Sequence, residues 1–222
     1  MSEASPAERL AAVRAAIGRA ASLAGRRADD VTLIAVSKTQ PQAAIGPLID
    51  AGHCAFGENR VQEAQAKWPA LREKFDGIEL HLIGQLQSNK AEEAVELFDA
   101  IHSVDRPSLV AALIRAMDKS GKRPRCFVQV NIGNEPQKGG RMLADLPALL
   151  EQCRRSELPL AGLMCIPPAD VEAAPYFALL AKLARVHDLP GLSIGMSGDY
   201  ETAVMAGASH VRVGTALFGA RD

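Results

Sequence analysis

An apolar run near the start of the chain reads Val31-Thr32-Leu33-Ile34-Ala35-Val36-Ser37-Lys38 and is followed by Pro41. About six apolar or β-branched residues in a row predict a buried strand. Lys38 ends this strand, so we expect its amine at the rim of an apolar core. Desolvation there disfavours the ammonium form, and a neutral amine is a nucleophile toward carbonyl carbon. The alternative is a lysine that extends from the strand end into water.

Seven similar runs follow, and segments with helical periodicity separate them. The eight predicted strands are Val31–Ser37, Cys54–Gly57, Glu79–Gly84, Ala100–Val104, Cys126–Asn131, Leu160–Ile166, Leu192–Met196 and His210–Gly214. The clearest helical patterns cover Val61–Phe75, Leu109–Lys119, Leu143–Arg155 and Tyr176–His187. Strands that alternate with helices predict an α/β protein, and eight of them predict a single (β/α)8 TIM barrel. An open doubly wound sheet is the alternative architecture.

An extra helix is predicted before the first strand. Ser5 and Glu8 have the spacing of a capping box, Pro6 suits the first helical position, and Gly25 can end the helix. No linker or change of composition divides the rest of the chain. Residues 1–222 are therefore predicted to form one domain.

Bulk composition limits the classes of function. Hydrophobic residues make up 48% of the 222 residues and aromatic residues only 4%, which favours parallel strands around an aliphatic core. A net charge of -1 gives no indication of nucleic-acid binding. The first residues lack the pattern of a signal peptide, and no apolar stretch is long enough to cross a membrane. The four cysteines form no C-x-x-C pair, so we expect free thiols in a reducing cytoplasm.

Polar and small residues gather at the predicted carboxyl ends of the strands, where TIM barrels carry their sites. Ser197-Gly198 and Gly214-Thr215 each enter a helix after the last two strands, and barrels often bind phosphate there. Free backbone N–H groups, a hydroxyl and a glycine suit an anion. Either turn alone would be an ordinary capped turn. The two together favour a phosphate site.

Arg212 is unusual because its neighbours in the last strand are Val211 and Val213. An inward arginine needs a partner, so it could pair with a carboxylate such as Glu58 or donate to a ring nitrogen or a phosphate. An amine, a phosphate cradle and an arginine on one barrel face suggest a phosphorylated aldehyde. The candidate is pyridoxal 5′-phosphate (PLP), held as a Schiff base on Lys38.

Other motif searches exclude several kinds of site. The glycine-rich fingerprints of dinucleotide and nucleoside-triphosphate sites are absent. The histidines show no metal-ligand spacing, so no metal site is predicted. His53, His102 and His187 are expected to be surface or packing residues.

Longer motifs around these positions are Ala35-Val36-Ser37-Lys38-Thr39, Phe56-Gly57-Glu58-Asn59 with Val61-Gln62-Glu63, His81-Leu82-Ile83-Gly84 with Leu86-Gln87-Ser88-Asn89-Lys90, and Val211-Arg212-Val213-Gly214-Thr215-Ala216-Leu217-Phe218-Gly219-Ala220-Arg221. Together they resemble the pyridoxal phosphate homeostasis proteins, and the likeness runs almost from end to end. The resemblance implies a barrel similar to the N-terminal domain of alanine racemase.

The same resemblance implies roles for individual residues. Lys38 is the aldimine lysine, Arg212 faces the pyridine nitrogen, and Asn59 and His81 lie near the cofactor. The residues that surround the phosphate are Ser197, Gly198, Gly214 and Thr215. Two positions depart from the family pattern, since Arg60 stands where Tyr is usual and Gly198 where Asp or Met is usual.

An arginine at the pyridine nitrogen disfavours protonation of the ring, and an unprotonated ring is a weaker electron sink. The chain ends shortly after the last strand, so we expect no second domain of the kind that completes the pocket in barrel racemases. The leading hypothesis is a monomeric, non-catalytic carrier and regulator of the intracellular supply of PLP (vitamin B6), which could pass PLP to PLP-dependent apo-enzymes. The alternatives are a PLP-dependent amino-acid racemase and a phosphosugar-type barrel without PLP.

Lys138, in Lys138-Gly139-Gly140 after the fifth strand, is a hypothetical second amine for PLP during transfer. An exposed loop lysine without such a role is the other interpretation.

Overall fold

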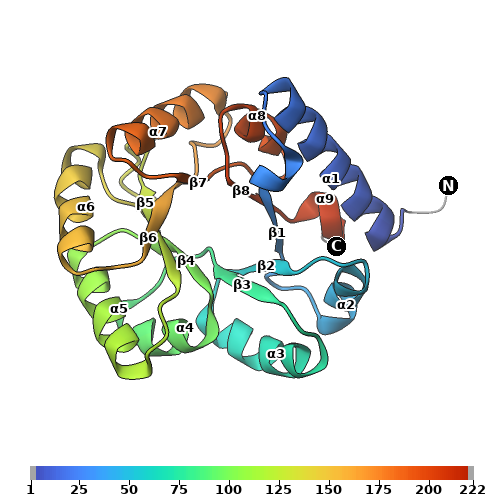
Figure 1. The fold of residues 1–222 in the computed structure, drawn as a ribbon, viewed down its shortest axis with the longest axis horizontal. Coiled ribbons are helices and arrows are strands. Elements are labelled where there is room, and N and C mark those ends of the chain that lie inside the picture. Colours follow the sequence, from blue (N-terminus) through green and yellow to red (C-terminus); the bar gives the residue numbers. More distant parts are fainter. Residues whose placement is uncertain (1–3, 220–222) are drawn as a thin grey trace.

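The computed structural model describes residues 4–219, and its strands close into a parallel barrel inside a ring of helices (Figure 1). The strands are β1 (Thr32–Val36), β2 (Ala55–Glu58), β3 (Glu79–Leu82), β4 (Ala100–Val104), β5 (Arg125–Val130), β6 (Leu160–Cys165), β7 (Gly191–Ser193) and β8 (His210–Val213). Each strand pairs with the next, and β8 pairs with β1, where Thr32 lies opposite His210. The predicted TIM barrel is confirmed, and the open sheet is excluded.

Helices connect the strands on the outside of the barrel. They are α1 (Pro6–Leu23), α2 (Gln42–Asp50), α3 (Val61–Lys74), α4 (Ala91–Leu97), α5 (Pro107–Ser120), α6 (Leu146–Arg155), α7 (Ala174–Val186), α8 (Tyr200–Met205) and α9 (Thr215–Phe218). Short 3-10 turns are η1 (Ala28–Asp30), η2 (Ser88–Lys90) and η3 (Leu143–Asp145). Residues 1–3 and 220–222 lie outside the described part, including Ala220-Arg221 of the last quoted motif.

The predicted extra helix is α1, and it completes the outer ring. Its capping box forms, since Glu8 N donates to Ser5 Oγ at 3.3 Å and Ser5 N donates to Glu8 Oε2 at 2.7 Å. The helix after β8, α9, has only four residues, and α1 packs beside it and α8 (Figure 1). Arg9 Nε fixes this placement by donating to Leu217 O at 2.7 Å.

The main boundary difference lies at β7, which ends at Ser193 although the apolar pattern predicts a strand to Met196. Gly195 has φ +90°, a conformation that favours glycine. A Cβ there would lie 2.5 Å from Ala203 Cβ, so the backbone passes close to α8 at this point. The chain therefore turns out of the strand early and carries Met196 and Ser197 to the barrel mouth.

Strand alternation creates two different packing layers. Outward side chains, such as Leu80, Leu82 and Val211, join the aliphatic layer between the sheet and the helices. Inward side chains, such as His81 and His102, belong to a largely polar interior that is nevertheless fully buried. Within residues 4–219, no helix is both long and apolar enough to cross a bilayer.

Candidate functional site

A cavity of about 340 Å³ lies at the carboxyl ends of β1, β2, β7 and β8. Its volume is in the range of small-molecule sites, about 300–1,000 Å³. Seven of the eight residues predicted to bind the cofactor line it. They are Lys38, Asn59, Ser197, Gly198, Arg212, Gly214 and Thr215, and the remaining lining residues are Val36, Ile83, Ile166 and Met196.

Lys38 is half-buried in a turn two residues after β1. The residue after it, Thr39, has φ +63°, which is unusual for a β-branched residue. The Glu63 carboxylate stabilises this turn by accepting from the Thr39 backbone N–H. On the other side of Lys38, Lys67 Nζ donates to Ser37 O at 2.8 Å. The backbone is therefore held immediately before and after Lys38.

A buried carboxylate completes this support. Glu58 Oε1 accepts from Ser37 Oγ at 2.7 Å, from Lys67 Nζ at 2.8 Å and from Trp68 Nε1 at 3.0 Å. Glu58 lies on β2 and points outward toward α3, which carries Lys67 and Trp68. The predicted alternative of a Glu58–Arg212 ion pair is thus wrong, because strand alternation puts the two side chains on opposite faces of the sheet.

Arg212 lies at the base of the cavity and is 4% exposed. Its Nη1 donates to Ser193 Oγ at 2.7 Å and its Nη2 donates to Cys165 O at 3.0 Å. Burial lowers the pKa of Arg212 to about 10, so the guanidinium stays cationic at neutral pH. No carboxylate within residues 4–219 forms an ion pair with it. A buried cation with only neutral partners is suited to an acceptor or anion that enters the cavity.

The two predicted phosphate turns meet at the same side of the cavity. Gly214 N donates to Ser197 Oγ at 3.1 Å, which joins the turn after β7 to the turn after β8. α8 and α9 begin directly after these turns. A Cβ at Gly198 would meet no atom within 4 Å, so the larger residues usual in the family would fit there. Arg60, the other departure, is exposed before α3 and does not line the cavity.

His81 differs from the expectation of a direct contact. It is fully buried inside the barrel and does not line the cavity. Its Nδ1 lies 2.9 Å from His102 Nε2, and His102 Nδ1 lies 2.8 Å from Ser193 Oγ, the partner of Arg212. His81 is therefore connected to the cavity only through other side chains. His102, expected on the surface or in packing, is part of the same interior network.

Lys138 lines a neighbouring cavity of about 500 Å³, which shares Ile166, Met196 and Gly198 with the first one. Its Nζ lies 2.7 Å from Glu135 Oε2 and donates to Pro167 O at 3.2 Å. Lys138 is thus a half-buried, paired amine beside the site rather than a freely exposed loop lysine.

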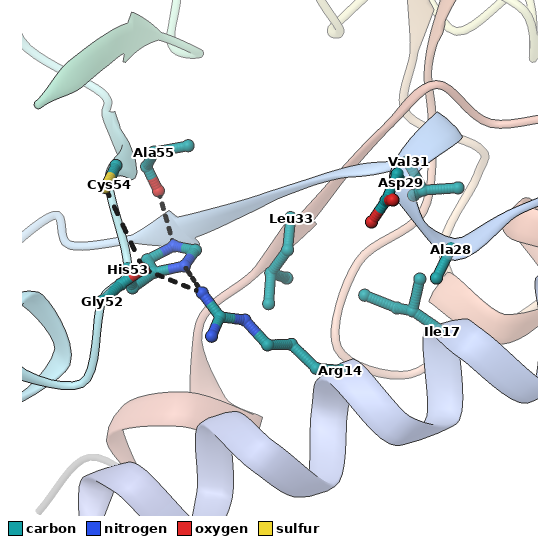
Figure 2. Close-up of a pocket in the computed structure, with 10 residues that line it drawn as sticks. All are labelled: Arg14, Ile17, Ala28, Asp29, Val31, Leu33, Gly52, His53, Cys54 and Ala55. Carbon is teal, nitrogen blue, oxygen red and sulfur yellow. Dashed lines mark hydrogen bonds between the residues drawn. The ribbon is translucent and has the colours of Figure 1, made fainter. Parts of the chain in front are cut away.

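Another cavity, of about 360 Å³, lies at the opposite end of the barrel between α1 and the amino ends of β1 and β2 (Figure 2). Arg14 Nη2 donates to Gly52 O at 3.1 Å, and His53 Nε2 donates to Ala55 O at 2.8 Å. Burial lowers the pKa of His53 to about 4, so its ring is neutral. None of the predicted site residues reaches this cavity, which is therefore separate from the candidate site.

Sequence reasoning missed the residues that support the site. The side chain of Ser193 contacts both Arg212 and His102. The side chains of Glu63 and Lys67 contact the backbone of the turn around Lys38. The i, i+4 spacing of Glu63 and Lys67 on a predicted helix was the one available signal. That spacing does not reveal that Lys67 points inward toward Glu58.

Comparison with known proteins finds a matching family model, similar proteins and similar solved structures. Residues 9–222 match the family model described as alanine racemase, N-terminal domain. The pyridoxal phosphate homeostasis protein of Escherichia coli K12 is 41% identical over 97% of both chains, and that of Pseudomonas aeruginosa is 42% identical over 97% of this chain and 96% of the relative. A structure of PipY from Synechococcus elongatus PCC7942 with PLP bound has a TM-score of 0.83 and 41% identity, covering 97% of this chain and all of PipY.

An alanine racemase from Streptomyces lavendulae shares the fold, with a TM-score of 0.68 at 19% identity. It covers 96% of this chain, but only 58% of the racemase is matched. The sequence identity and coverage of the nearer relatives, together with the family model, establish that this chain belongs to the pyridoxal phosphate homeostasis proteins, whose barrel is that of the alanine racemase N-terminal domain.

Proposed function

We propose that this protein holds PLP reversibly as a Schiff base on Lys38 and acts as a carrier and regulator of the intracellular PLP supply. The observation that carries the proposal is the single cavity that brings together Lys38, the buried Arg212 cation and the turns at Ser197 and Gly214. The names of the relatives and the PLP-bound PipY structure support the choice of PLP among phosphorylated aldehydes.

The donors around the cavity fit the chemistry of PLP. Ser197, Gly198, Gly214 and Thr215 offer hydroxyl and backbone N–H groups to the phosphate. Arg212 would offer its guanidinium to the ring nitrogen, and Asn59 lines the cavity directly after β2. The Lys38 amine would form a carbon–nitrogen double bond with the aldehyde and release one water. His81 would act on the site only through His102, Ser193 and Arg212.

Arg212 also favours a carrier over a catalyst. PLP supplies an electron sink to enzymes, most strongly when its ring nitrogen is protonated. A cationic guanidinium at that nitrogen disfavours the protonated ring. The cavity shares three lining residues with the neighbouring one, so we expect a substrate to be poorly confined between them. The match to the alanine racemase family model keeps a PLP-dependent racemase as the second candidate.

The proposed attachment point is tested by reduction of the PLP complex with borohydride, followed by peptide mass mapping. We expect the reduced adduct on the peptide that contains Lys38, and none in Lys38→Ala. Lys138→Ala is the matched control, since it removes a nearby amine and should leave the Lys38 adduct in place. An adduct on another side chain, or none at all, would contradict the proposal.

Activity assays separate the two candidates. A panel of L-amino acids incubated with the PLP-loaded protein should show no racemisation beyond that of free PLP. Sustained turnover of one amino acid, lost in Lys38→Ala, would establish the racemase instead.

We propose a monomer in the cytoplasm that transfers PLP to apo-enzymes. All four cysteines are free thiols in the described residues, which supports a reducing compartment. Light scattering of the purified protein tests the monomer, and transfer of PLP to an apo-transaminase in the presence of a free-PLP trap tests the handover.

A further inference from the structure

The barrel interior beneath the cofactor cavity contains several buried polar side chains. TIM-barrel interiors are usually filled with branched aliphatic residues. Here His81, His102 and Ser193 are fully buried and come from β3, β4 and β7. Each contacts the next, and Ser193 contacts Arg212 of β8 at the base of the cavity. Burying this many polar groups is unfavourable unless each finds a partner, so their arrangement needs an explanation.

The contacts form one continuous chain across the barrel. It begins at Glu79 Oε1, which lies at the amino end of β3, contacts Arg125 and is 3.2 Å from His81 Nε2. The next two contacts are His81 Nδ1 to His102 Nε2 at 2.9 Å and His102 Nδ1 to Ser193 Oγ at 2.8 Å. The chain ends where Arg212 Nη1 meets Ser193 Oγ at 2.7 Å.

Both histidines in the chain are neutral at physiological pH. Burial lowers the pKa of His81 to about 4, and burial, the neighbouring histidine rings and the Arg212 guanidinium hold the pKa of His102 well below its usual range. Each ring therefore carries one proton, on Nδ1 or on Nε2.

Arg212 favours one position for that proton, because the Ser193 hydroxyl proton would otherwise be buried without an acceptor. A guanidinium can only donate, so Ser193 Oγ accepts from Arg212. Within residues 4–219, His102 Nδ1 is the only acceptor recorded for the Ser193 hydroxyl proton. His102 is then protonated on Nε2 and donates to His81 Nδ1. His81 is in turn protonated on Nε2, which faces the Glu79 carboxylate. All donors point from Arg212 toward Glu79.

We propose that His81, His102 and Ser193 form a directed hydrogen-bond relay, with the Glu79 carboxylate 3.2 Å from its far end, that orients Arg212 and holds its charge at the ring-nitrogen side of the cofactor cavity. The aligned bonds place their negative ends toward the guanidinium, which stabilises a cation that has no carboxylate partner in the described residues. Ser193 and His102 are thus positioning residues, because they act through Arg212. The role in PLP binding rests on the proposed function, whereas the direction of the relay does not.

The direction is tested in the protein without PLP by long-range ¹H–¹⁵N spectra of the histidine rings. We expect His81 and His102 both to be protonated on Nε2 and bare on Nδ1. Protonation on Nδ1 of either ring would overturn the relay. This measurement needs no variant and no cofactor, so it remains decisive even if PLP fails to bind at Lys38.

The coupling is tested with two serine variants in different strands of the barrel, β7 and β4. Ser193→Ala removes the acceptor of Arg212 and the donor to His102. Ser103→Ala is the matched control, since Ser103 is equally buried on β4 and its hydroxyl has no partner in the described residues. We expect Ser193→Ala alone to shift the His102 Nδ1 resonance.

In PLP titrations followed by absorbance, Ser193→Ala should also weaken binding about tenfold and shift the visible band, because a hydrogen bond to a charged group is lost. Ser103→Ala should change neither quantity. Equal effects of the two variants, or wild-type affinity in Ser193→Ala, would overturn the role of the relay in holding Arg212. If borohydride reduction of the wild-type protein with PLP gives no adduct on Lys38, the proposed function is overturned instead.

Discussion

At the scale of single residues, the least expected feature is the ion pair of Lys67 and Glu58 behind the Lys38 turn. The Glu58 side chain is fully buried and that of Lys67 is 9% exposed. Such pairs are costly to desolvate, so their net contribution to stability is small, but loss of one partner leaves the other charge stranded. Because Lys67 also donates to Ser37 O, the main effect of the pair is to fix the backbone next to Lys38.

Lys67→Met should therefore lower the free energy of unfolding by about 3–5 kcal/mol, since methionine replaces the stem but leaves Glu58 without its cation. Urea denaturation measures the change. Lys119→Met is the control, because Lys119 pairs with Glu92 on the exposed surface and should give no measurable loss. If Lys67→Met is as stable as the wild type, loss of the cation leaves no stranded charge on Glu58, and the prediction is wrong.

Lys38 and Arg212 could be found from the sequence because Lys38 directly follows an apolar run and Arg212 interrupts one, and both are local properties. Lys67, Ser193 and His102 could not be found in this way. Their roles depend on partners from other elements, and a lysine on a helix or a serine in a strand is ordinary until those partners are known. Arg212 was recognised as unusual, but its partner was not predictable for the same reason.

At the scale of elements, β6 and β7 approach each other through glycine. A Cβ at Gly162 would overlap the carbonyl of Gly191, and a Cβ at Gly191 would overlap Ala161 O and lie 2.8 Å from Phe127 Cε1. The two strands pair here, with Gly162 opposite Gly191. The absence of side chains lets β7 sit close enough to place Ser193 in the interior relay and Ser197 at the mouth.

Gly162→Ala is expected to destabilise the protein by about 3 kcal/mol, because backbone atoms rather than flexible side chains would have to move. Thermal and urea unfolding both measure this. Gly46→Ala is the control, since Gly46 lies inside α2 with no atom within 4 Å of a Cβ, and alanine there should stabilise the helix by about 0.5–1 kcal/mol. The same loss in both variants would mean that glycine at position 162 has no special packing role.

The order and type of the elements followed from hydrophobic periodicity, and the capping box predicted the start of α1. The placement of α1 did not follow. It depends on how short α9 is, and four residues between Gly214 and Gly219 give too little pattern to identify a helix end. The end of β7 was missed because Gly195 turns the chain while Ile194 and Met196 continue the apolar pattern.

At the scale of the whole molecule, closure of the barrel decides which residues share its interior. The alternation of strands and helices was sufficient to predict the barrel, but not which face of each strand points inward. The interior contains His81, His102 and His210 around Phe127, with His102 stacked on the phenylalanine ring at 4.3 Å. Neutral histidines therefore replace part of the aliphatic interior, and this makes the stability of the protein sensitive to acid.

The sign of that sensitivity follows from the pKa values in the two states. Burial lowers the pKa of His81 and of His53 to about 4 and that of His210 to about 3, while an unfolded histidine titrates near 6.5. Below about pH 6.5 the unfolded chain binds protons that the folded protein excludes. Stability is thus fully present above pH 6.5 and falls as the pH drops toward 4.

Between pH 6.5 and 5, where most carboxylates stay ionised, the free energy of unfolding should fall by up to about 1.4 kcal/mol per pH unit for each buried histidine. Urea denaturation at a series of pH values measures this slope. His53→Gln provides the internal standard, because His53 lies outside the barrel interior, at the cavity of Figure 2. Its removal should lower the slope by the contribution of one titrating histidine. An unchanged slope in His53→Gln would mean that the His53 ring accepts a proton in the folded protein. A stability that stays constant from pH 6.5 to 5 would mean the same of the interior rings, and the neutral relay beneath Arg212 would then have to be abandoned as well.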